Sequence, residues 1–472
     1  MDMNGSYRGG RAGWWRSVTD GEVALAVGLV VLGVWLQRAL PVVAVAFALA
    51  LTRRVRIGVL LVGATVGGLG AVRSEHEWAN AVPRSLGASA GRVCLVTDPA
   101  PVQGAVVAIV EIEGERFQVW ARGSPGRRLA RHLAGECAVM EGRRRLLNDP
   151  AAHRGAIRHV VGRFDIDRIG DWDPGGVADR ASNRVRRLFA SGASLVGSPD
   201  DALFAGLVIG DDRHQSIAVI EQFRAAGLSH LTAVSGSNVA FVLAAAAPVL
   251  RRLRPSMRWM VTLGAITWFA ALTRFEPSIV RASVMAAIAA TGVLLGREKP
   301  PGRVLALAVG ALVLVDPMLV WSVGFWLSVA ATAGVALLSG RVAMLLPGPR
   351  WFAVPAGVTI GAQIAVAPVS LLVFGTLPIV SVPANLLAVP VAGLVMLYGL
   401  PAGLAAGALG GAIGRVVQFP SGLGTRWVST VAALAARLEP PAPWPGVGWI
   451  AVVGFLGIRA VRCAKVGGWR ST

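Results

Sequence analysis

Charged residues are scarce in this chain. Only 15% of its 472 residues are Asp, Glu, Lys or Arg, whereas 54% are hydrophobic. Soluble domains contain about 25% charged residues, so an ordinary water-soluble fold is excluded. About twelve long apolar runs lie between Glu22 and Ile458, several of them shorter than the ~20 residues that a straight span needs. The sequence therefore predicts a polytopic α-helical membrane protein with about 10–12 spans.

Signatures of nucleotide and metal binding are absent as well. The sequence contains no Gly-x-x-x-x-Gly-Lys-[Ser/Thr] phosphate loop, so the chain is not expected to hydrolyse ATP itself. No His-x-His-x-Asp-His cluster, which could hold a metal pair, occurs among its histidines. There are six of these: His76, His132, His153, His159, His214 and His230. The sequence predicts no metal site, no cofactor and no enzymatic activity.

Lysine is nearly missing, and the arginines are clustered. Only Lys299 and Lys465 are lysine among 46 basic residues, and the net charge is +20. Arginine clusters such as residues 251–258 and 297–303 lie beside the ends of apolar runs, and such loops tend to be cytoplasmic. Both chain ends are then cytoplasmic, and the spans in residues 1–73 lead to the outer side. The first run lacks a small-residue cleavage site, which predicts an anchor rather than a cleaved signal peptide.

Residues 74–170 form the only predicted water-soluble domain, on the extracytoplasmic side. Residues 106–113 and 116–121 alternate apolar and polar side chains around Gly114, which is typical of a β-hairpin. Further strands are predicted in three segments, at residues 92–97, 136–147 and 157–165. About five short strands fit one small closed β-barrel of the oligonucleotide-binding (OB) type.

The second half of this outer domain is strongly basic. Between Arg116 and Arg145 there are eight arginines and two glutamates, a local net charge of +6. Basic surfaces with aromatic rings suit single strands, because phosphates take the charge and bases stack on the rings. A merely solvated basic face is the alternative. The predicted DNA-binding residues are Arg116, Phe117, Trp120, Arg122, Arg127, Arg128, Arg131, Arg143, Arg144 and Arg145.

Cysteine occurs only three times. Cys94 and Cys137 both fall on predicted strands of the outer domain, where an oxidising compartment permits a disulfide. The sequence does not give the distance between them, so a disulfide and two free thiols both remain open. Cys463 lies in the predicted cytoplasmic tail, residues 462–472, and is expected to be a free thiol.

Residues 171–226 are expected to lie at the membrane surface. Apolar residues repeat at helical spacing from Val177 to Leu195, with arginines on an adjacent face. This pattern fits a helix in the membrane interface with its basic side toward the headgroups, and equally a helix packed on the neighbouring barrel. Residues 199–214 then place about nine apolar residues between acidic pairs, too few to span, which predicts an interfacial or re-entrant segment.

The stretch GLSHLTAVSGSNVAFVLAAAA, residues 227–247, places polar side chains inside an apolar run. Polar groups at membrane depth must face protein or water, and a broken helix also exposes amides that can bind phosphate. The residues predicted to line a polar path are His230, Ser235, Gly236, Ser237 and Asn238. Hydrogen bonding between helices and catalysis by Ser235 with His230 are the alternatives.

Arg281 is unusual because it lies within the apolar run of TRFEPSIVRASVMAAIAA rather than at its end. A charge at this depth costs at least ~2.5 kcal/mol and usually marks an ion pair or a pathway. Glu276 and Asp316 are the predicted partners if the role is structural. From residue 231 onward there are eighteen Arg and Lys residues and only four acidic ones. This local net charge of +14 favours a path for an anion.

The chain resembles ComEC-type competence proteins, inner-membrane channels that admit transforming DNA. The resemblance lies in four ordered stretches: FRAAGLSHLTAVSGSNVAFV, SIVRASVM, VDPMLVWSVGFWLSVAATAGV and TIGAQIAVAPVSLLVFGTLPIVSVPANLLAVPV. The N-terminal spans and the outer barrel also resemble the family's layout. The positions that match recurrent family residues are Gly227, His230, Ser235, Gly236, Asn238, Arg281, Asp316, Pro317, Gly324, Phe325, Ser328, Pro368, Asn385 and Pro390.

This resemblance implies a channel for single-stranded transforming DNA in the bacterial inner membrane, with residues 227–461 as the channel domain. Asp316, Ser328 and Asn385 would then line the DNA path together with Arg281 and the polar residues of 230–238. The implied partners are single-stranded DNA, membrane lipid, an outer DNA-receptor protein, a cytoplasmic ATPase and a second copy of this chain in a homodimer.

One family feature is missing from this sequence. Many members continue into a metallo-β-lactamase-like domain, thought to degrade the strand that is not transported, whereas this sequence ends in a short basic tail. The sequence therefore predicts a channel without its own nuclease.

Two other functions fit part of the sequence. A secondary transporter of small anionic solutes would also use broken helices and an intramembrane arginine, but it would not need an outer barrel. A membrane-embedded hydrolase would depend on Ser235 and His230. Five residues apart on a helix, these two side chains point about 140° away from each other, which disfavours joint catalysis.

Overall fold

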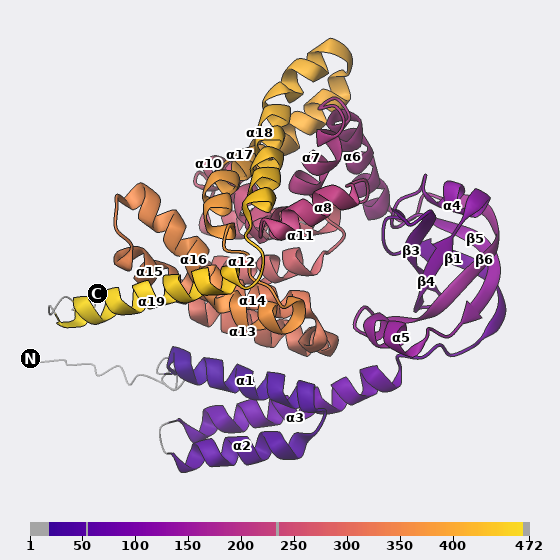
Figure 1. The fold of residues 1–472 in the computed structure, drawn as a ribbon. Coiled ribbons are helices and arrows are strands. Elements are labelled where there is room, and N and C mark those ends of the chain that lie inside the picture. The colour runs from indigo at the N-terminus through magenta and orange to yellow at the C-terminus, as the bar shows by residue number, and fades with distance from the viewer. Residues whose placement is uncertain (1–17, 53–54, 233–235, 466–472) are drawn as a thin grey trace, which may run out of the picture. The chain divides into compact units, whose positions relative to one another are not determined.

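The computed structural model describes residues 18–52, 55–232 and 236–465 (Figure 1). The chain divides into two units with separate packing. Unit one comprises the residues up to Trp78 together with Lys299–Trp321, and unit two comprises Ala79–Glu298 and the residues from Ser322 onward.

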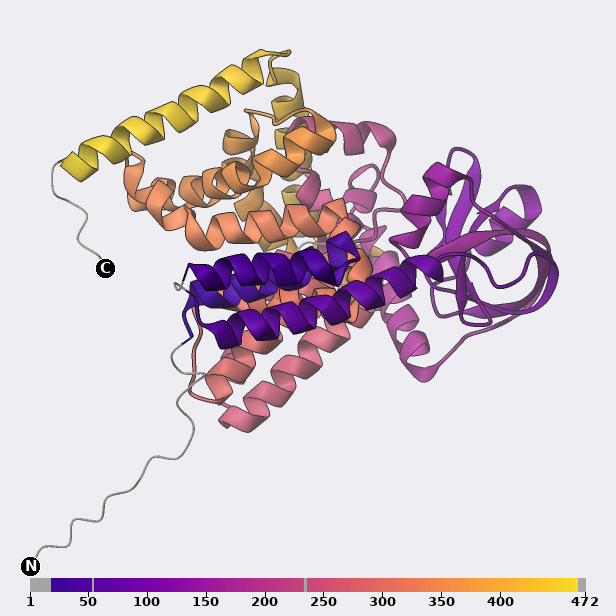
Figure 2. The same ribbon diagram turned by 90° about the horizontal axis from the view of Figure 1, so that it is seen from below.

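Unit one consists of helices. They are α1 (Asp20–Leu36), α2 (Ala39–Leu51), α3 (Ile57–Ala79), α13 (Pro301–Val315) and the 3-10 helix η2 (Pro317–Trp321). Figure 2 shows the first three, coloured indigo to purple, running side by side. Small residues permit this packing, since a Cβ on Gly33 would lie 2.2 Å from the carbonyl oxygen of Gly67. Arg73 ties α3 to α13 by donating to the carbonyls of Leu314 (2.6 Å) and Val315 (2.8 Å).

Unit two begins with a closed β-barrel. Its strands are β1 (Gly87–Leu95), β2 (Ala100–Val102), β3 (Ala105–Ile112), β4 (Glu115–Ala121), β5 (Cys137–Arg145) and β6 (Val160–Asp173). The sheet order is β1-β5-β6-β4-β3-β2, and pairing of β1 with β3 closes five of the strands into a ring. The β4–β6 pair is parallel, whereas the other pairs are antiparallel. Two short helices, α4 (Gly123–Leu129) and α5 (Asp149–Ala156), interrupt the strands.

Alternating side chains fill the barrel as the sequence predicts. In β4 every second residue from Glu115 to Ala121 is buried, and in β5 Met140 is buried between the exposed Val139 and Glu141. The predicted hairpin is confirmed: Glu113 and Gly114 both have positive φ, 52° and 79°, as the tightest hairpin turns require. The barrel continues past the predicted boundary at residue 170, since β6 ends at Asp173.

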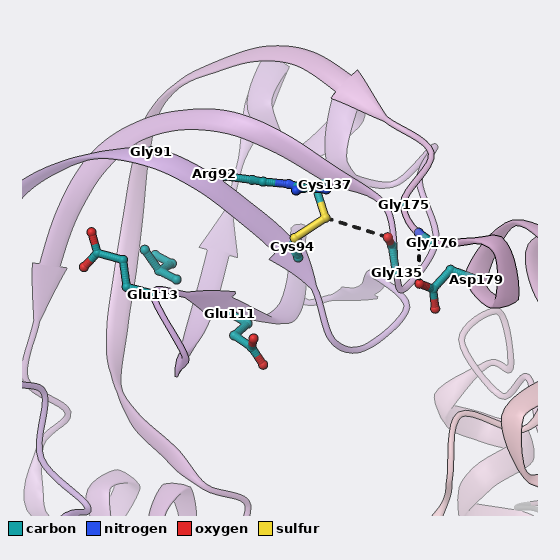
Figure 3. A pocket seen from close by; sticks show the side chains of 11 residues that line it. Gly91, Arg92, Cys94, Glu111, Glu113, Gly135, Cys137, Gly175, Gly176 and Asp179 are labelled. Carbon is teal, nitrogen blue, oxygen red and sulfur yellow. Dashed lines mark hydrogen bonds between the residues drawn. A yellow bond between two sulfur atoms is a disulfide. The ribbon is translucent and has the colours of Figure 1, made fainter.

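Cys94 and Cys137 are joined as a disulfide. They occupy directly opposite positions on β1 and β5, so the bond fastens these two strands at one end of the barrel. Figure 3 shows the bond at the wall of a cavity of about 550 Å³, which Glu111 and Glu113 of the barrel also line. Cys463 is a free thiol on the last helix.

The rest of unit two is helical. The helices before residue 299 are α6 (Val177–Ala193), α7 (Asp200–Ile209), α8 (Ile217–Ala225), α9 (Ser229–Thr232), α10 (Gly236–Leu250), α11 (Pro255–Leu272) and α12 (Pro277–Leu294). Those after residue 321 are α14 (Val323–Leu337), α15 (Ser339–Leu345), α16 (Arg350–Phe374), α17 (Ser381–Leu409), α18 (Gly411–Leu438) and α19 (Trp444–Lys465).

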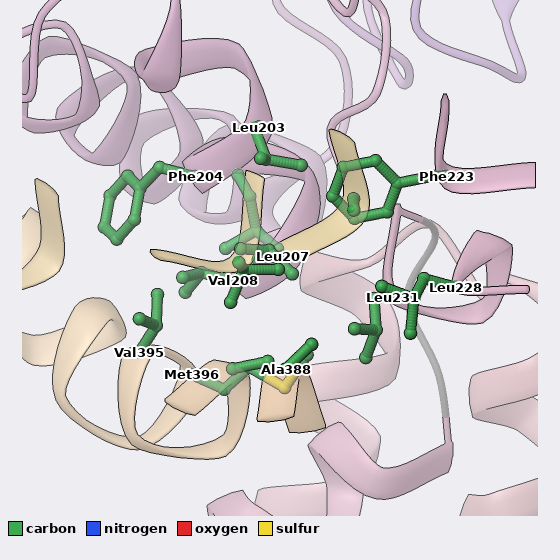
Figure 4. Packing of buried hydrophobic residues seen from close by; sticks show 14 of the residues in the cluster. Leu203, Phe204, Leu207, Val208, Phe223, Leu228, Leu231, Ala388, Val395 and Met396 are labelled. Carbon is green, nitrogen blue, oxygen red and sulfur yellow. The ribbon is translucent and has the colours of Figure 1, made fainter. Parts of the chain in front are cut away.

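The short helix α7 lies at the centre of this helical part. Phe204 and Leu207 of α7 are fully buried and pack with Val395 and Met396 of α17 and with Leu231 (Figure 4). The segment 199–214, expected as an interfacial or re-entrant piece, is therefore a ten-residue helix inside the core. Its apolar residues are buried against protein, which explains why so short a run can be entirely hydrophobic.

Helix α6 packs against α17 through glycines. A Cβ on Gly192 would lie 1.9 Å from the carbonyl oxygen of Gly403, and one on Gly407 would lie 2.0 Å from that of Leu188. Such distances leave no room for a side chain, so the two backbones are in direct contact. The apolar residues that repeat at helical spacing from Val177 to Leu195 thus belong to a helix that packs against protein.

Replacing Gly407 with valine should disrupt this contact. The new side chain would collide with the backbone of α6, which cannot turn away as a side chain can, so the cost should exceed the roughly 1–3 kcal/mol of ordinary overpacking. We expect a clearly lower unfolding temperature of the purified protein. Gly264→Val on α11, where nothing lies within 4 Å of the added carbon, is the matched control. Equal unfolding temperatures for the two variants would refute the close contact.

The predicted number of spans is too high. Among the described residues, five helices are long and apolar enough to cross a membrane, or six if α14 and α15, which meet at 53°, form one broken span. These are α3, α12, α16, α17 and α19. Several apolar runs fold into shorter helices, such as the thirteen residues of α2, which reach only about 20 Å. The chain is a mostly helical, multi-pass membrane protein with one near-barrel domain.

Candidate functional site

The polar stretch of residues 230–238 is described only in part. α9 ends at Thr232 and α10 begins at Gly236. Ser235 and the side chain of Ser237 lie outside the described part of the chain. His230, on the short helix α9, is exposed. Residues 233–235, between these two helices, lie outside the described part of the chain, so the single span from 231 to 250 stays a prediction.

Asn238 is buried in the first turn of α10, with 2% of its surface exposed. Its side-chain amide donates to the carbonyl oxygen of Leu207 on α7 at 3.2 Å. Its Oδ1 has no hydrogen-bond partner among the described residues. Asn238 therefore fastens α10 to α7 with one end of its amide and leaves a buried acceptor at the other.

Arg281 lies on α12, in the turn that faces the start of α10. A Cβ on Gly236 would lie 3.1 Å from the Cβ of Ala282, so the two helices touch one residue away from the arginine. Arg281 is only 7% exposed. Its guanidinium stands over the ring of Phe325 on α14, 5.5 Å from the centroid. Three helices, α10, α12 and α14, thus enclose one cation.

This cation lacks an anionic partner within the described part of unit two. Nε and Nη1 of Arg281 form no hydrogen bond there, and the predicted pair with Glu276 is not among the ion pairs. A ring face offers only weak compensation for a buried charge, and buried charges are otherwise paired. The site can therefore bind an anion that supplies the missing acceptors.

The other predicted path residues are dispersed. Asp316 is in unit one, at the end of α13, where its carboxylate accepts from the backbone N–H of Met318 at 3.0 Å. Asn385 is buried in α17 and donates to the carbonyl of Ser381 at 2.6 Å. Ser328, on α14, is half-buried. Among the described residues of unit two, Gly236 lies beside Ala282, next to Arg281 in the chain, whereas Asn238 is bonded to α7.

The barrel separates the predicted DNA-binding residues into two groups. Phe117 is completely buried in the barrel core, and Arg144 is 5% exposed, with its guanidinium paired to Glu113 at 2.8 Å. Neither can touch a nucleic acid, so both predictions fail because strand alternation turns these side chains inward. Arg116 and Trp120 are half-buried, and the members that remain exposed are Arg122, Arg127, Arg128, Arg131, Arg143 and Arg145.

Trp120, the aromatic residue that remains in this group, lies on an outward face of β3 and β4. Trp120 is half-buried and pairs across the strands with Val107, while Gln118 pairs with Ile109 and Arg116 with Glu111. Arg163 of β6 lies beside Gln118 in register. We call Arg116, Gln118, Trp120 and Arg163 the outer face of the barrel.

A buried charge cluster joins the barrel to the helices, and the sequence reading missed it. Asp98, which follows β1, pairs with Arg186 of α6 at 2.8 Å and with Arg274, after α11, at 2.9 Å. Burial alone would raise the pKa of Asp98, but these guanidiniums outweigh it and hold the pKa below its usual value. Asp211 extends the cluster by pairing with Arg186 at 3.4 Å and with Arg213 at 2.6 Å.

No group of three or more His, Cys, Asp or Glu side chains that could hold a metal ion occurs among the residues that the structure describes.

Comparison with known proteins identifies a protein family and two curated relatives. The family model described as competence protein matches residues 207–463, more than half of the chain. The ComE operon protein 3 of Bacillus subtilis (strain 168) is 26% identical over 285 residues, covering 60% of this chain and 36% of its own length. The uncharacterized protein YcaI of Escherichia coli (strain K12) is 28% identical over 233 residues, covering 45% of this chain and 30% of its own length.

This chain thus spans about a third of the length of these curated relatives. No solved structure matches it. The family match begins within α7 and ends near the end of α19, so it includes the start of α10, Arg281 on α12 and Phe325 on α14. Because the family model matches more than half of the chain and the ComE operon protein 3 is a relative, the chain belongs to the competence protein family.

Proposed function

We propose that this protein is an inner-membrane channel through which single-stranded DNA enters the cytoplasm during natural transformation. The observation that supports this most is the guanidinium of Arg281, buried between three helices in a competence-family domain and without an anionic partner in unit two. A phosphodiester supplies both missing features, a negative charge and acceptor oxygens.

The arrangement at Arg281 suits an anion that passes rather than one that stays. A single guanidinium with a ring beneath it offers few hydrogen bonds, whereas tight phosphate sites combine several donors. Arg281 would lower the cost of bringing each successive phosphate into a low-dielectric region. Asn238, with its unpaired acceptor, would contact base or sugar donors on the same strand.

The outer barrel is proposed to be of the OB type and to receive the strand first. Numbered along the chain, its five ring strands pair in the order one-two-three-five-four-one, a five-stranded Greek-key barrel. Three residues of the outer face lie on its third strand, β4, and Arg163 lies on its fifth, β6; OB barrels bind oligonucleotides on the face of the second and third strands. Its arginines attract phosphates, and Trp120 offers a ring for base stacking.

The proposal includes an orientation and partners. The barrel lies outside the cytoplasm, both chain ends lie inside, and the arginine-rich loops at 251–258 and 297–303 are cytoplasmic, which requires α10 and α11 to cross the membrane in addition to α12. Transport needs an energy source and a DNA supply, which we assign to a cytoplasmic ATPase and an outer DNA-receptor protein. A second copy of this chain is a further proposed partner.

Cysteine labelling tests the orientation. In a Cys463→Ser background, Arg128→Cys should react with an impermeant maleimide added from outside, and Arg254→Cys should react only after the membrane is opened. Cys94 and Cys137 do not interfere, because they are joined as a disulfide. Labelling of Arg254→Cys alone from outside would reverse the orientation.

Gene deletion tests the function itself. In the bacterium that carries this protein, deletion should leave labelled duplex DNA bound at the cell surface but remove the fraction that becomes nuclease-protected. The wild-type gene supplied on a plasmid should restore that fraction. Unchanged internalisation in the deletion strain would refute the proposal. A transporter of small anions, which Arg281 alone would also fit, predicts lost phosphate or carboxylate uptake with normal DNA entry.

A further inference from the structure

The contacts of Asp98 cross from the barrel to two helical elements. Its side chain is 7% exposed, and it accepts from Arg186 of α6 and from Arg274 of the α11–α12 turn. The backbone N–H of Ala134, also in the barrel domain, donates to the same carboxylate at 2.8 Å. One carboxylate of the barrel therefore pairs with two guanidiniums of the helical part, and Asp211 supplies a second carboxylate to Arg186.

The same guanidiniums hold the α11–α12 turn on both sides. Arg186 donates to the carbonyl of Leu272, the last residue of α11, at 2.9 Å. Arg274 donates to Oδ1 of Asn183 on α6 at 2.7 Å, and the amide of Asn183 donates to the carbonyl of Ala134 at 3.2 Å. The turn is thus bound to α6 and the barrel through side chains that meet at Asp98.

This turn has a backbone that does not form readily by itself. Arg274 and Phe275 have positive φ, 60° and 52°, two consecutive left-handed residues that are not glycine. L side chains disfavour this conformation, so surrounding contacts must maintain it. The residues that follow are Glu276 and Pro277, the first residue of α12, and Arg281 comes one helical turn later.

We propose that Asp98 is a positioning residue for Arg281. Through Arg186 and Arg274 it keeps the α11–α12 turn in its left-handed form, and so fixes where α12 starts and where Arg281 stands beside α10. The ligand of Arg281 rests on the proposed function, whereas the link from Asp98 to the turn can be tested without any ligand.

Hydrogen–deuterium exchange on the full chain in lipid nanodiscs tests the link. Asp98→Asn keeps the shape of the side chain but leaves the guanidiniums of Arg186 and Arg274 without their shared charge. Because a hydrogen bond to a charged group contributes about tenfold or more to such an equilibrium, we expect exchange in residues 273–280 to accelerate at least about tenfold. Exchange in β3 and β4 should stay as in the wild type.

Asp173→Asn is the matched control, because this exposed carboxylate forms its ion pair within the barrel, with Arg92 at 2.8 Å, and accepts otherwise from the backbone N–H of Gly175. It should leave exchange in 273–280 unchanged. If Asp98→Asn does not insert, Arg274→Lys, which keeps the charge and loses the two-pronged contact with Asp98, is measured in the same way. Unchanged exchange at the turn, or equal acceleration throughout the barrel, would overturn the proposal.

DNA uptake separates positioning from general support. Asp98→Asn should reduce internalised DNA, and combining it with Arg281→Leu should cause no further loss beyond that of Arg281→Leu alone, since both changes act at one site. Losses that multiply would contradict positioning. If the wild type internalises no DNA at all, the proposed function fails, while the exchange measurement still decides the role of Asp98.

Discussion

Replacing Arg281 with leucine should reduce internalised DNA by about 10- to 100-fold, as expected for the loss of a charged hydrogen-bonding group worth roughly 1.5–3 kcal/mol. Membrane abundance should stay normal, and the unfolding temperature should stay equal or rise. The physical reason is that a buried charge without a partner costs free energy in the folded protein, which an apolar side chain does not. Surface-bound and nuclease-protected DNA are measured together with protein abundance.

The direction of the stability change distinguishes this account from a structural one. If Arg281 held the helices together through an ion pair, leucine would lower abundance and uptake in proportion. Arg281→Lys should retain part of the uptake if charge alone matters, and little if the planar fork contacts two phosphate oxygens. Arg341→Leu is the control, because this exposed arginine of α15 donates to the carbonyl of Leu337 at the end of α14, far along the chain from Phe325. It should leave uptake unchanged.

Replacing Trp120 with alanine should weaken binding of a single-stranded oligothymidylate by about 5- to 150-fold, because base stacking on one aromatic ring contributes roughly 1–3 kcal/mol. The full chain in nanodiscs is titrated with labelled oligonucleotide at several salt concentrations. Binding should also fall steeply as salt rises, because arginine–phosphate contacts release counterions.

Two variants of the barrel serve as comparisons for Trp120→Ala. Phe117→Leu should lower the unfolding temperature and leave oligonucleotide binding of the folded protein unchanged, because Phe117 lies wholly in the core. Arg168→Gln removes one positive charge near Glu141, away from the outer face, and should change binding little. Equal binding by Trp120→Ala and the wild type at low salt would contradict the outer face as the binding surface.

The sequence predicts the strands of the barrel better than it predicts which of their side chains face outward. Period-two alternation and Gly114 identify β3 and β4 nearly to the residue, because one face of each strand is buried and the other is not. Composition alone, however, cannot tell which side a given residue faces. Composition therefore groups Phe117 with Trp120 as DNA-binding residues, although strand alternation places them on opposite faces.

The membrane part shows a similar limit. Hydropathy identifies apolar runs, but it cannot tell that α7 is apolar because protein surrounds it. Long-range charge pairs are invisible in one sequence, since Asp98 and Arg274 are separated by 176 positions. Arg281 was identified because an isolated charge in an apolar run stands out without any knowledge of its neighbours.

The most direct measurement captures DNA at the buried arginine during uptake. Phe325, whose ring lies beneath Arg281, is replaced with a photoreactive azidophenylalanine, and cells are illuminated while labelled duplex DNA enters. The account predicts a crosslink to one DNA strand at Phe325, no crosslink from the same group at the exposed Phe374 of α16, and loss of the Phe325 crosslink when Arg281 is leucine. Internalised DNA without a crosslink at Phe325 would contradict a DNA path past Arg281.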